Sequence, residues 1–204
     1  MENHAWRIFI AIELPIEVRE RIAAHVTRLR ELVPDAHASW TRPENIHLTL
    51  KFLGDTPQTH IDKVSGATSQ TVTHFHPFKL GVSGSGAFPP RSTPKVLWIG
   101  VSDPEGTLAK LQTRLEEECF RVGVKKESRR FRPHLTLCRR RKPQDARMLA
   151  ATHIQLQFEP IEFEVSEVSV IRSELSSVGS RYTTISRHPL DEQDSTSLRS
   201  GRSE

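Results

Sequence analysis

The tetrapeptide His-Leu-Thr-Leu occurs twice in this chain of 204 residues, first from His47 and again, 87 residues later, from His134. The surrounding segments also repeat in order: a β-branched strand, a helix opened by a proline, and a second strand. Pro15 and Pro104 open the two helices, as proline does in the first turn. A repeat of this length predicts two similar lobes, and the cleft between such lobes commonly binds a ligand.

The length predicts one bilobed domain over residues 1–186, followed by a polar segment, 187–204, that has no periodicity and is expected to be a disordered tail. No run of about 18 apolar residues is present, so no membrane-spanning helix is expected. The two cysteines, Cys119 and Cys138, form no CxxC pair. This argues against a disulfide scaffold or thiolate zinc site and for a reducing cytoplasm.

Alternation along the two strands assigns the motif side chains to faces. His47 and Thr49 lie on one face and the leucines on the other, and His134 and Thr136 repeat this arrangement. Arg132, two residues before His134, is expected on the same polar face. Because imidazole exchanges protons near neutral pH, one histidine can activate water while the other protonates a leaving oxygen. Hydroxyls and a guanidinium can hold the non-bridging oxygens of a phosphate.

A strongly basic window adds to this picture. The net charge of the chain is +4, yet nine basic residues and one acid, Glu127, lie between Lys125 and Lys142. A concentrated positive patch favours a polyanionic ligand. A solvated basic loop without a ligand is the alternative for Arg129, Arg130 and the run that begins at Arg139.

Three other features point to ordinary structural roles. Trp40 and Phe52 flank the first motif and are expected to pack in the core or anchor loops, with stacking on a base as the alternative. The Gly/Pro/Ser-rich segment 83–94 is expected to be a loop, and it lacks the third glycine of a nucleotide fingerprint. His74 and His76 have a spacing that suits a metal, but no acidic or cysteine partners stand nearby in the sequence, so no metal site is expected.

The paired motifs and four longer stretches resemble one enzyme group. RIFIAIELP, WTRPENIHLTLKFLGD, PKVLWIGV and FRPHLTLCR are similar to the two-histidine phosphoesterase superfamily and, more closely, to RNA 2',3'-cyclic phosphodiesterases, historically called 2'-5' RNA ligases. The resemblance covers about Trp6 to Ser186. It implies an α+β fold with two pseudo-symmetric lobes of antiparallel β-sheet, outer helices and a central cleft.

The same resemblance implies roles for the motif residues. His47 would donate a proton to the departing O3', His134 would accept one from water, and Thr49 and Thr136 would contact phosphate. The substrate would be RNA ending in a 2',3'-cyclic phosphate and the product a 2'-phosphomonoester, with no cofactor, no metal, no membrane and no obligate protein partner. The alternatives are a nucleotide-binding module without turnover, a 2'-5' RNA ligase, and an esterase of small cyclic nucleotides.

Overall fold

The computed structural model describes residues 5–89, 93–140, 146–176 and 179–191, and within them nine strands form one sheet flanked by four α-helices. The strands are β1 (Ala5–Glu13), β2 (Ala38–Trp40), β3 (His47–Pro57), β4 (Phe78–Phe88), β5 (Val96–Ser102), β6 (His134–Arg140), β7 (Ile161–Val165), β8 (Glu167–Ser176) and β9 (Gly179–Pro189). The helices are α1 (Ile16–Leu32), α2 (Ile61–Val72), α3 (Thr107–Arg121) and α4 (Ala146–Leu156), with short 3-10 turns η1 (Pro43–Asn45) and η2 (Gln58–His60).

The sheet divides into two halves at its centre. Its strand order is β7-β4-β5-β6-β3-β1-β8-β9, and its pairings are antiparallel. The two halves meet where Leu48 of β3 lies opposite Leu135 of β6. Beyond this contact, toward the end of β6, the short strand β2 pairs with β6 in place of β3. The α+β fold with two lobes of antiparallel sheet, expected from the resemblance, is therefore confirmed.

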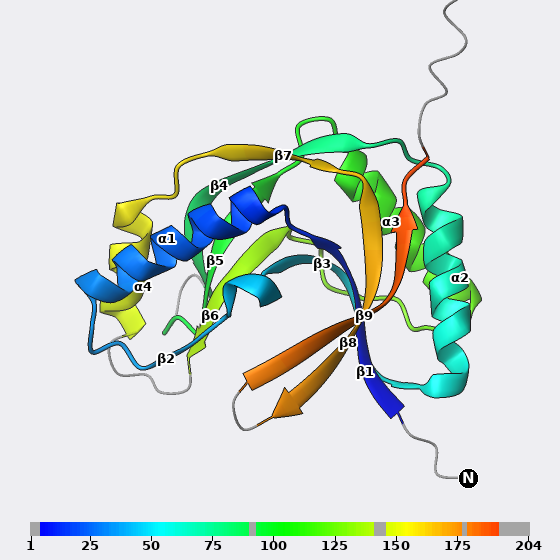
Figure 1. The fold of residues 1–204 in the computed structure, drawn as a ribbon, viewed down its shortest axis with the longest axis horizontal. Helices are drawn as coiled ribbons and strands as arrows, with labels where there is room; N and C mark the ends of the chain where they lie inside the picture. The colour runs from blue at the N-terminus through cyan, green and yellow to red at the C-terminus, as the bar shows by residue number, and fades with distance from the viewer. Residues whose placement is uncertain (1–4, 90–92, 141–145, 177–178, 192–204) are drawn as a thin grey trace, which may run out of the picture.

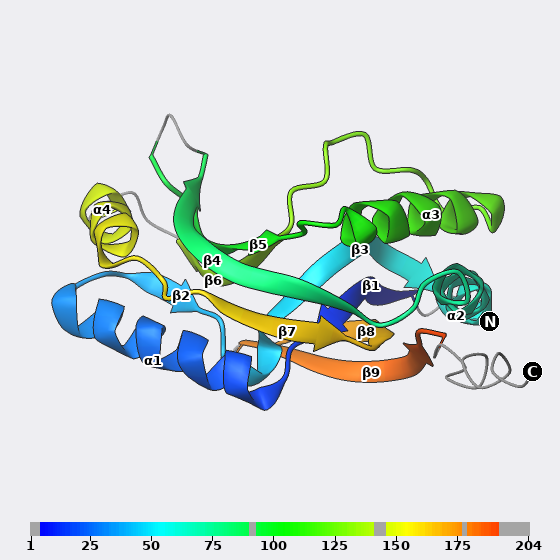
Figure 2. The ribbon, with the colours of Figure 1, turned by 90° about the horizontal axis from the view of Figure 1, so that it is seen from above.

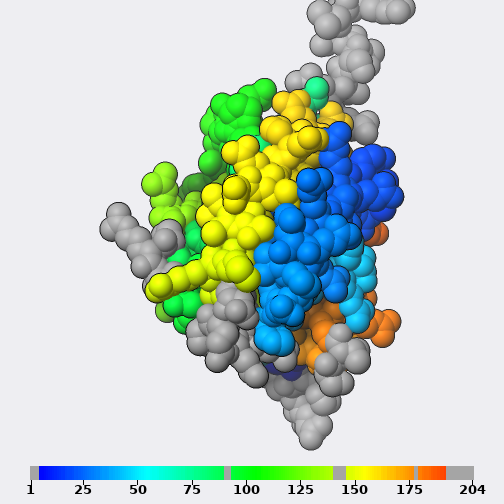
Figure 3. All heavy atoms as spheres, turned by 90° about the vertical axis from the view of Figure 1, so that its left-hand side faces the viewer, coloured from blue at the N-terminus to red at the C-terminus, as the bar shows by residue number. Residues whose placement is uncertain are grey.

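The two halves are related by an approximate two-fold repeat. The series β1-α1-β3-α2 is matched by β5-α3-β6-α4. However, α1 packs beside α4, and α3 packs beside α2, at opposite ends of the molecule (Figures 1 and 2). Figure 3 shows α1 and α4 side by side on one face. Each series thus contributes one helix to each outer pair, which couples the two lobes.

The glycine-rich segment after residue 83 differs from the sequence expectation. β4 continues to Phe88 instead of ending at Val82, so the expected loop is wrong over its first half. Gly84 has a positive φ of 74° and lies at an irregularity in the pairing with β5. At Gly86 the indole of Trp98 occupies the space where a Cβ would lie. Gly84 therefore allows a bulge in β4, and Gly86 leaves room for the indole that Trp98 of β5 places against it.

The ordered chain also extends beyond the boundary expected at Ser186. β9 ends at Pro189, and Leu190 is buried with its N–H donating to the Ser166 carbonyl at 2.8 Å. The first residues of the expected tail, up to the buried Leu190, are therefore part of the fold. Residues 192–204, the rest of that segment, lie outside the described residues. None of the described helices is long and apolar enough to cross a membrane.

Candidate active site

The two tetrapeptide motifs line one cavity of about 550 Å³ at the centre of the sheet. His47 and Thr49 enter it from β3, and His134 and Thr136 enter it from β6. Their leucine neighbours are all buried on the opposite face (Leu48, Leu50, Leu135 and Leu137). The alternation predicted from the sequence is therefore confirmed for both motifs.

The strand register places the two motifs side by side, running in opposite directions. Because Leu48 lies opposite Leu135 in an antiparallel pair, the adjacent positions place His47 by Thr136 and Thr49 by His134. The two histidines are then diagonal neighbours on one face, a relation that separates residues by about 7–8 Å. This spacing suits two groups that act on one phosphate between them.

Both imidazoles are oriented by the same backbone contact. The Nδ1 of His47 donates to the Asn45 carbonyl at 2.8 Å, and the Nδ1 of His134 donates to the Arg132 carbonyl at 2.7 Å. A carbonyl oxygen only accepts, so Nδ1 carries the hydrogen in both rings. Each neutral ring therefore keeps an unprotonated Nε2, and each protonated ring has an Nε2–H to donate.

His47 sits in an aromatic pocket formed by the N-terminal and C-terminal strands. Its ring stacks on Phe9, with centroids 4.6 Å apart, and meets the edge of Tyr182 at 5.3 Å. Burial lowers the pKa of His47, and the positive charges of Arg139 and His134 add to this, whereas the Asn45 carbonyl and the Glu13 carboxylate oppose it.

His134 has aromatic neighbours of its own but no carboxylate in the corresponding place. Phe88 meets its ring edge-on at 5.3 Å, and Trp98 lies at 6.5 Å. The residue opposite His134 on β5 is Gly100, whereas Glu13 is opposite His47 on β1. A Cβ at Gly100 would lie 2.7 Å from the Ser83 carbonyl oxygen, so this position must stay without a side chain.

A pair of β-bulges, which the sequence analysis did not foresee, adds two residues to the cavity. In β3 the register shifts so that Leu50 is an extra residue, and in β6 the same happens at Leu137. A bulge reverses the faces of the residues that follow it. Phe52 and Arg139, each five residues after its histidine, therefore enter the cavity. This equal spacing is the one signal that could have found them.

Phe52 is 51% exposed, and the guanidinium of Arg7 lies 4.7 Å from the centre of its ring. Phe52 is therefore not packed in the core, which was one of the two roles expected for it from the sequence, the other being to anchor a loop. Trp40, which was expected to pack in the same way, is half-buried against the core.

Arg132 lies apart from the cavity that the other motif residues share. β6 begins only at His134, after Pro133, so alternation does not extend back to residue 132. Arg132 is exposed, and it is absent from the cavity lining; its contribution is the backbone carbonyl that orients His134. Arg139 is the arginine that β6 presents to the cavity.

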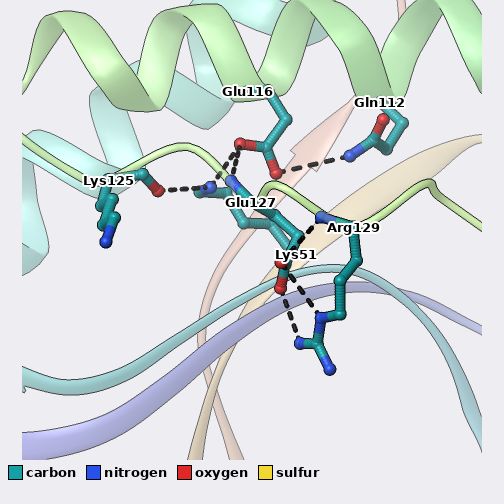
Figure 4. Close-up of polar contacts among 6 residues, drawn as sticks. All are labelled: Lys51, Gln112, Glu116, Lys125, Glu127 and Arg129. Carbon is teal, nitrogen blue, oxygen red and sulfur yellow. Dashed lines mark hydrogen bonds and ion pairs between the residues drawn. The ribbon is translucent and has the colours of Figure 1, made fainter.

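The loop before β6, which holds the first part of the basic window, is tied down away from the cavity. Lys51, 4% exposed, donates to Glu116 of α3 at 2.5 Å and to the Lys125 carbonyl at 3.0 Å. Figure 4 shows this network together with the ion pair between Arg129 and Glu127. The Arg129 guanidinium lowers the pKa of Glu127 to about 2, so Arg129 faces a carboxylate within the loop itself.

The histidine pair considered for a metal is engaged elsewhere. His74 accepts a hydrogen bond from Arg114 at 2.5 Å, and the Nδ1 of His76 donates to the Asp191 carbonyl at 2.8 Å. Over the described part of the chain, no group of three or more potential metal ligands occurs.

Comparison with known proteins places this geometry in a family. The model of the 2'-5' RNA ligase superfamily matches residues 18–176. A protein of Methanothermobacter thermautotrophicus named RNA 2',3'-cyclic phosphodiesterase is 36% identical over 180 residues, which cover 87% of this chain and 95% of that protein.

Solved structures agree with the sequence match. TT0787 of Thermus thermophilus has a TM-score of 0.75 and 27% identity, covering 92% of this chain and 99% of that chain. E. coli LigT complexed with 3'-AMP has a TM-score of 0.70 and 26% identity, covering 93% and 99%.

Proposed function

This chain belongs to the 2'-5' RNA ligase superfamily, and we propose that it hydrolyses the 2',3'-cyclic phosphodiester at the end of RNA to a 2'-phosphomonoester. The observation that carries the proposal is the pair of imidazoles on one cavity, each held with Nδ1 on a carbonyl and Nε2 left for the substrate. Relatives named RNA 2',3'-cyclic phosphodiesterase support the choice of substrate.

In the proposed reaction, the Nε2 of His134 accepts a proton from water as the water oxygen attacks phosphorus. The P–O3' bond breaks, and the Nε2–H of His47 gives its proton to O3'. The phosphate stays on O2', and the two histidines have exchanged protonation states. Both proton transfers use imidazole, so the mechanism needs no metal ion. Solvent then resets the pair.

The surroundings of the two rings support this division of roles. Burial lowers the pKa of His47, and the Glu13 carboxylate opposes that lowering. The arriving phosphate anion opposes it further and so favours the protonated form that donates. The glycine opposite His134 provides no such carboxylate, which suits a base that starts neutral. Thr49 and Thr136 donate to the non-bridging oxygens, and Arg139 offsets the charge that develops on them.

Phe52 provides the surface for the terminal base. Its exposed ring lies on the cavity wall, and bases at RNA ends commonly stack on aromatic side chains. A relative crystallised with 3'-AMP supports a nucleotide in this cavity. Cys119 and Cys138 are buried and form no disulfide bond, which fits the reducing cytoplasm as the location.

The test is incubation, in EDTA, with an RNA oligonucleotide that ends in a 2',3'-cyclic phosphate. Chromatography against 2'- and 3'-phosphate standards should identify a 2'-phosphate product. A 3'-phosphate product, a joined 2'-5' strand with a 5'-hydroxyl acceptor, or binding without turnover would each contradict the proposal. Dependence on a divalent ion would contradict the metal-free mechanism.

The roles are tested by replacing the bridging 3'-oxygen of the substrate with sulfur, a leaving group that needs no proton. This substrate should restore turnover to the His47→Ala variant and leave His134→Ala inactive. Rescue of His134→Ala instead would reverse the assignment.

A further inference from the structure

A second cavity, of about 600 Å³, adjoins the active site. Its walls are β2 and η1 on one side and the β8–β9 hairpin on the other. The two cavities share six lining residues, among them Arg139, Asn45 and Tyr182. The two cavities therefore adjoin along these shared residues, and Arg139 is one of them.

The charge of this second cavity suits an anion. His37, Trp40 and Arg42 line it and not the first cavity, and its described lining includes no Asp or Glu. By contrast, the neighbouring cavity of about 380 Å³ has Asp55 and Glu174 in its lining. These carboxylates balance the charges of Arg7 and Arg172 there. A phosphodiester backbone that leaves the active site is therefore favoured toward Arg42, where the described lining carries arginine and no carboxylate.

The walls of the second cavity are held by hydrogen bonds that tie β2 and η1 to the rest of the sheet. Asn45 Nδ2 donates to the Ser180 carbonyl of β9 at 2.8 Å. The Thr41 N–H donates to the Leu137 carbonyl of β6 at 2.8 Å, and β2 pairs with β6 through Trp40 and Cys138. Because these walls are already held in place before a ligand binds, binding should require a smaller loss of conformational entropy.

We propose that the second cavity binds the nucleotide that precedes the cyclic end, so that this site takes single-stranded RNA at least two nucleotides long; the inference rests on the function proposed above. Arg139 and Arg42 contact the phosphate that joins the two nucleotides. The half-buried indole of Trp40 offers its exposed part to the preceding base, since such stacking tolerates any base.

The competing path for the RNA is the basic loop before β6, and the repeat provides a matched control. Arg42 and Arg129 each stand five residues before a motif histidine. Arg42 lines the second cavity. Arg129 lines neither cavity, is 86% exposed at its side chain and pairs with Glu127 at 2.7 Å. Each variant removes one guanidinium at the same distance before a motif histidine, and the two guanidinium groups lie in different places.

The experiment measures KM for a nucleoside 2',3'-cyclic phosphate and for a dinucleotide with the same end, using the wild type, Arg42→Ala, Arg42→Lys and Arg129→Ala. In the wild type the added nucleotide should lower KM. Arg42→Ala should raise the KM of the dinucleotide about 10-fold relative to that of the mononucleoside, and Arg42→Lys should restore part of the difference. Arg129→Ala should leave the ratio unchanged.

The outcomes separate this inference from the function it rests on. A wild type that turns over neither substrate rejects the proposed function. Turnover of both with equal KM values rejects only the second subsite, as does an Arg42→Ala effect of the same size on both substrates. If Arg129→Ala weakens the dinucleotide as much as Arg42→Ala, the RNA passes over the basic loop. Where Arg42→Ala fails to fold, the wild-type comparison still tests whether the preceding nucleotide binds, and Arg129→Ala still tests whether the basic loop holds it.

Discussion

His47 and His134 are oriented by the same backbone device, yet their neighbours differ. Each Nδ1 donates to the carbonyl two residues earlier. His47 is stacked on Phe9 and faces Glu13 across the strand pair, whereas the corresponding place beside His134 is Gly100. The repeat therefore gives both rings the same orientation. In the mechanism proposed above, their different neighbours would distinguish the proton donor from the acceptor.

The difference continues five residues after each histidine. Matching bulges bring Phe52 and Arg139 to equivalent places on the two sides of the cavity. One side provides an aromatic surface and the other a cation. A symmetric backbone thus presents two different side chains, which suits the proposed substrate, because a nucleotide has a flat base at one end and a charged phosphate at the other.

The largest expected effect tests whether the two histidines act as one unit. His47→Ala and His134→Ala should each lower kcat by about 10²–10⁴-fold, because each removes one proton transfer. The double variant should be little worse than either single variant. Steady-state kinetics measures this, with far-UV circular dichroism as the control for folding. Multiplicative loss in the double variant would show that the two rings act independently.

The threonines test the symmetric part of the comparison. Thr49→Val and Thr136→Val each remove a hydroxyl from the cavity and keep the β-branched shape. Each should lower kcat/KM by about 10–100-fold, the range for a hydrogen bond to a charged group. Similar losses are expected because the register places both hydroxyls equivalently. An effect confined to one of them would break the symmetry inferred for the phosphate site.

The outer helix pairs should differ in their response to acid. Between α1 and α4, His25 Nε2 lies 3.1 Å from His153 Nδ1, and burial followed by the charge of His153 lowers the pKa of His25 to about 4. The α2–α3 pair contains no such histidine couple among its described contacts. The unfolded chain protonates His25 near pH 6.5, so its neutral burial stabilises the fold above that pH, and this contribution is lost as the pH falls toward 4.

Urea unfolding at pH 7 and pH 5 should therefore give a free energy of unfolding about 1–2 kcal/mol lower at pH 5 from this group, allowing for its partial exposure. His25→Gln keeps a hydrogen-bond donor but does not titrate, and it should reduce the fall. An unchanged pH dependence in this variant would assign the acid sensitivity to other groups.

The smallest expected effect concerns the pocket around His47. Phe9→Leu should expose the ring of His47 and raise its pKa toward 6.5, because burial is the largest cause of the lowering. An NMR titration of the histidine ring protons measures the shift. Phe88→Leu, on the other ring, is the matched control and should leave the titration of His47 in place. A lower pKa in Phe9→Leu would contradict the burial explanation.

The sequence alone predicted the parts of the site that follow local rules. The repeated tetrapeptide and two-residue alternation placed His47, Thr49, His134 and Thr136 on one cavity and their leucines in the core. The same rule failed for Arg132, because Pro133 precedes the strand and alternation does not apply outside it. The glycine-rich start of the expected loop proved to be part of β4, since its glycines make room for Trp98.

The sequence by itself determined the repeat, the paired histidines and the side of the strand they occupy, because each depends only on residue type and spacing within a few positions. Only the tertiary structure decided that Phe52 and Arg139 join the cavity, since a bulge is defined by the register with the neighbouring strand. It also decided that α1 and α3 pack in opposite pairs and that the groove continues along β2. These features depend on contacts between segments far apart in the chain, which no local pattern specifies.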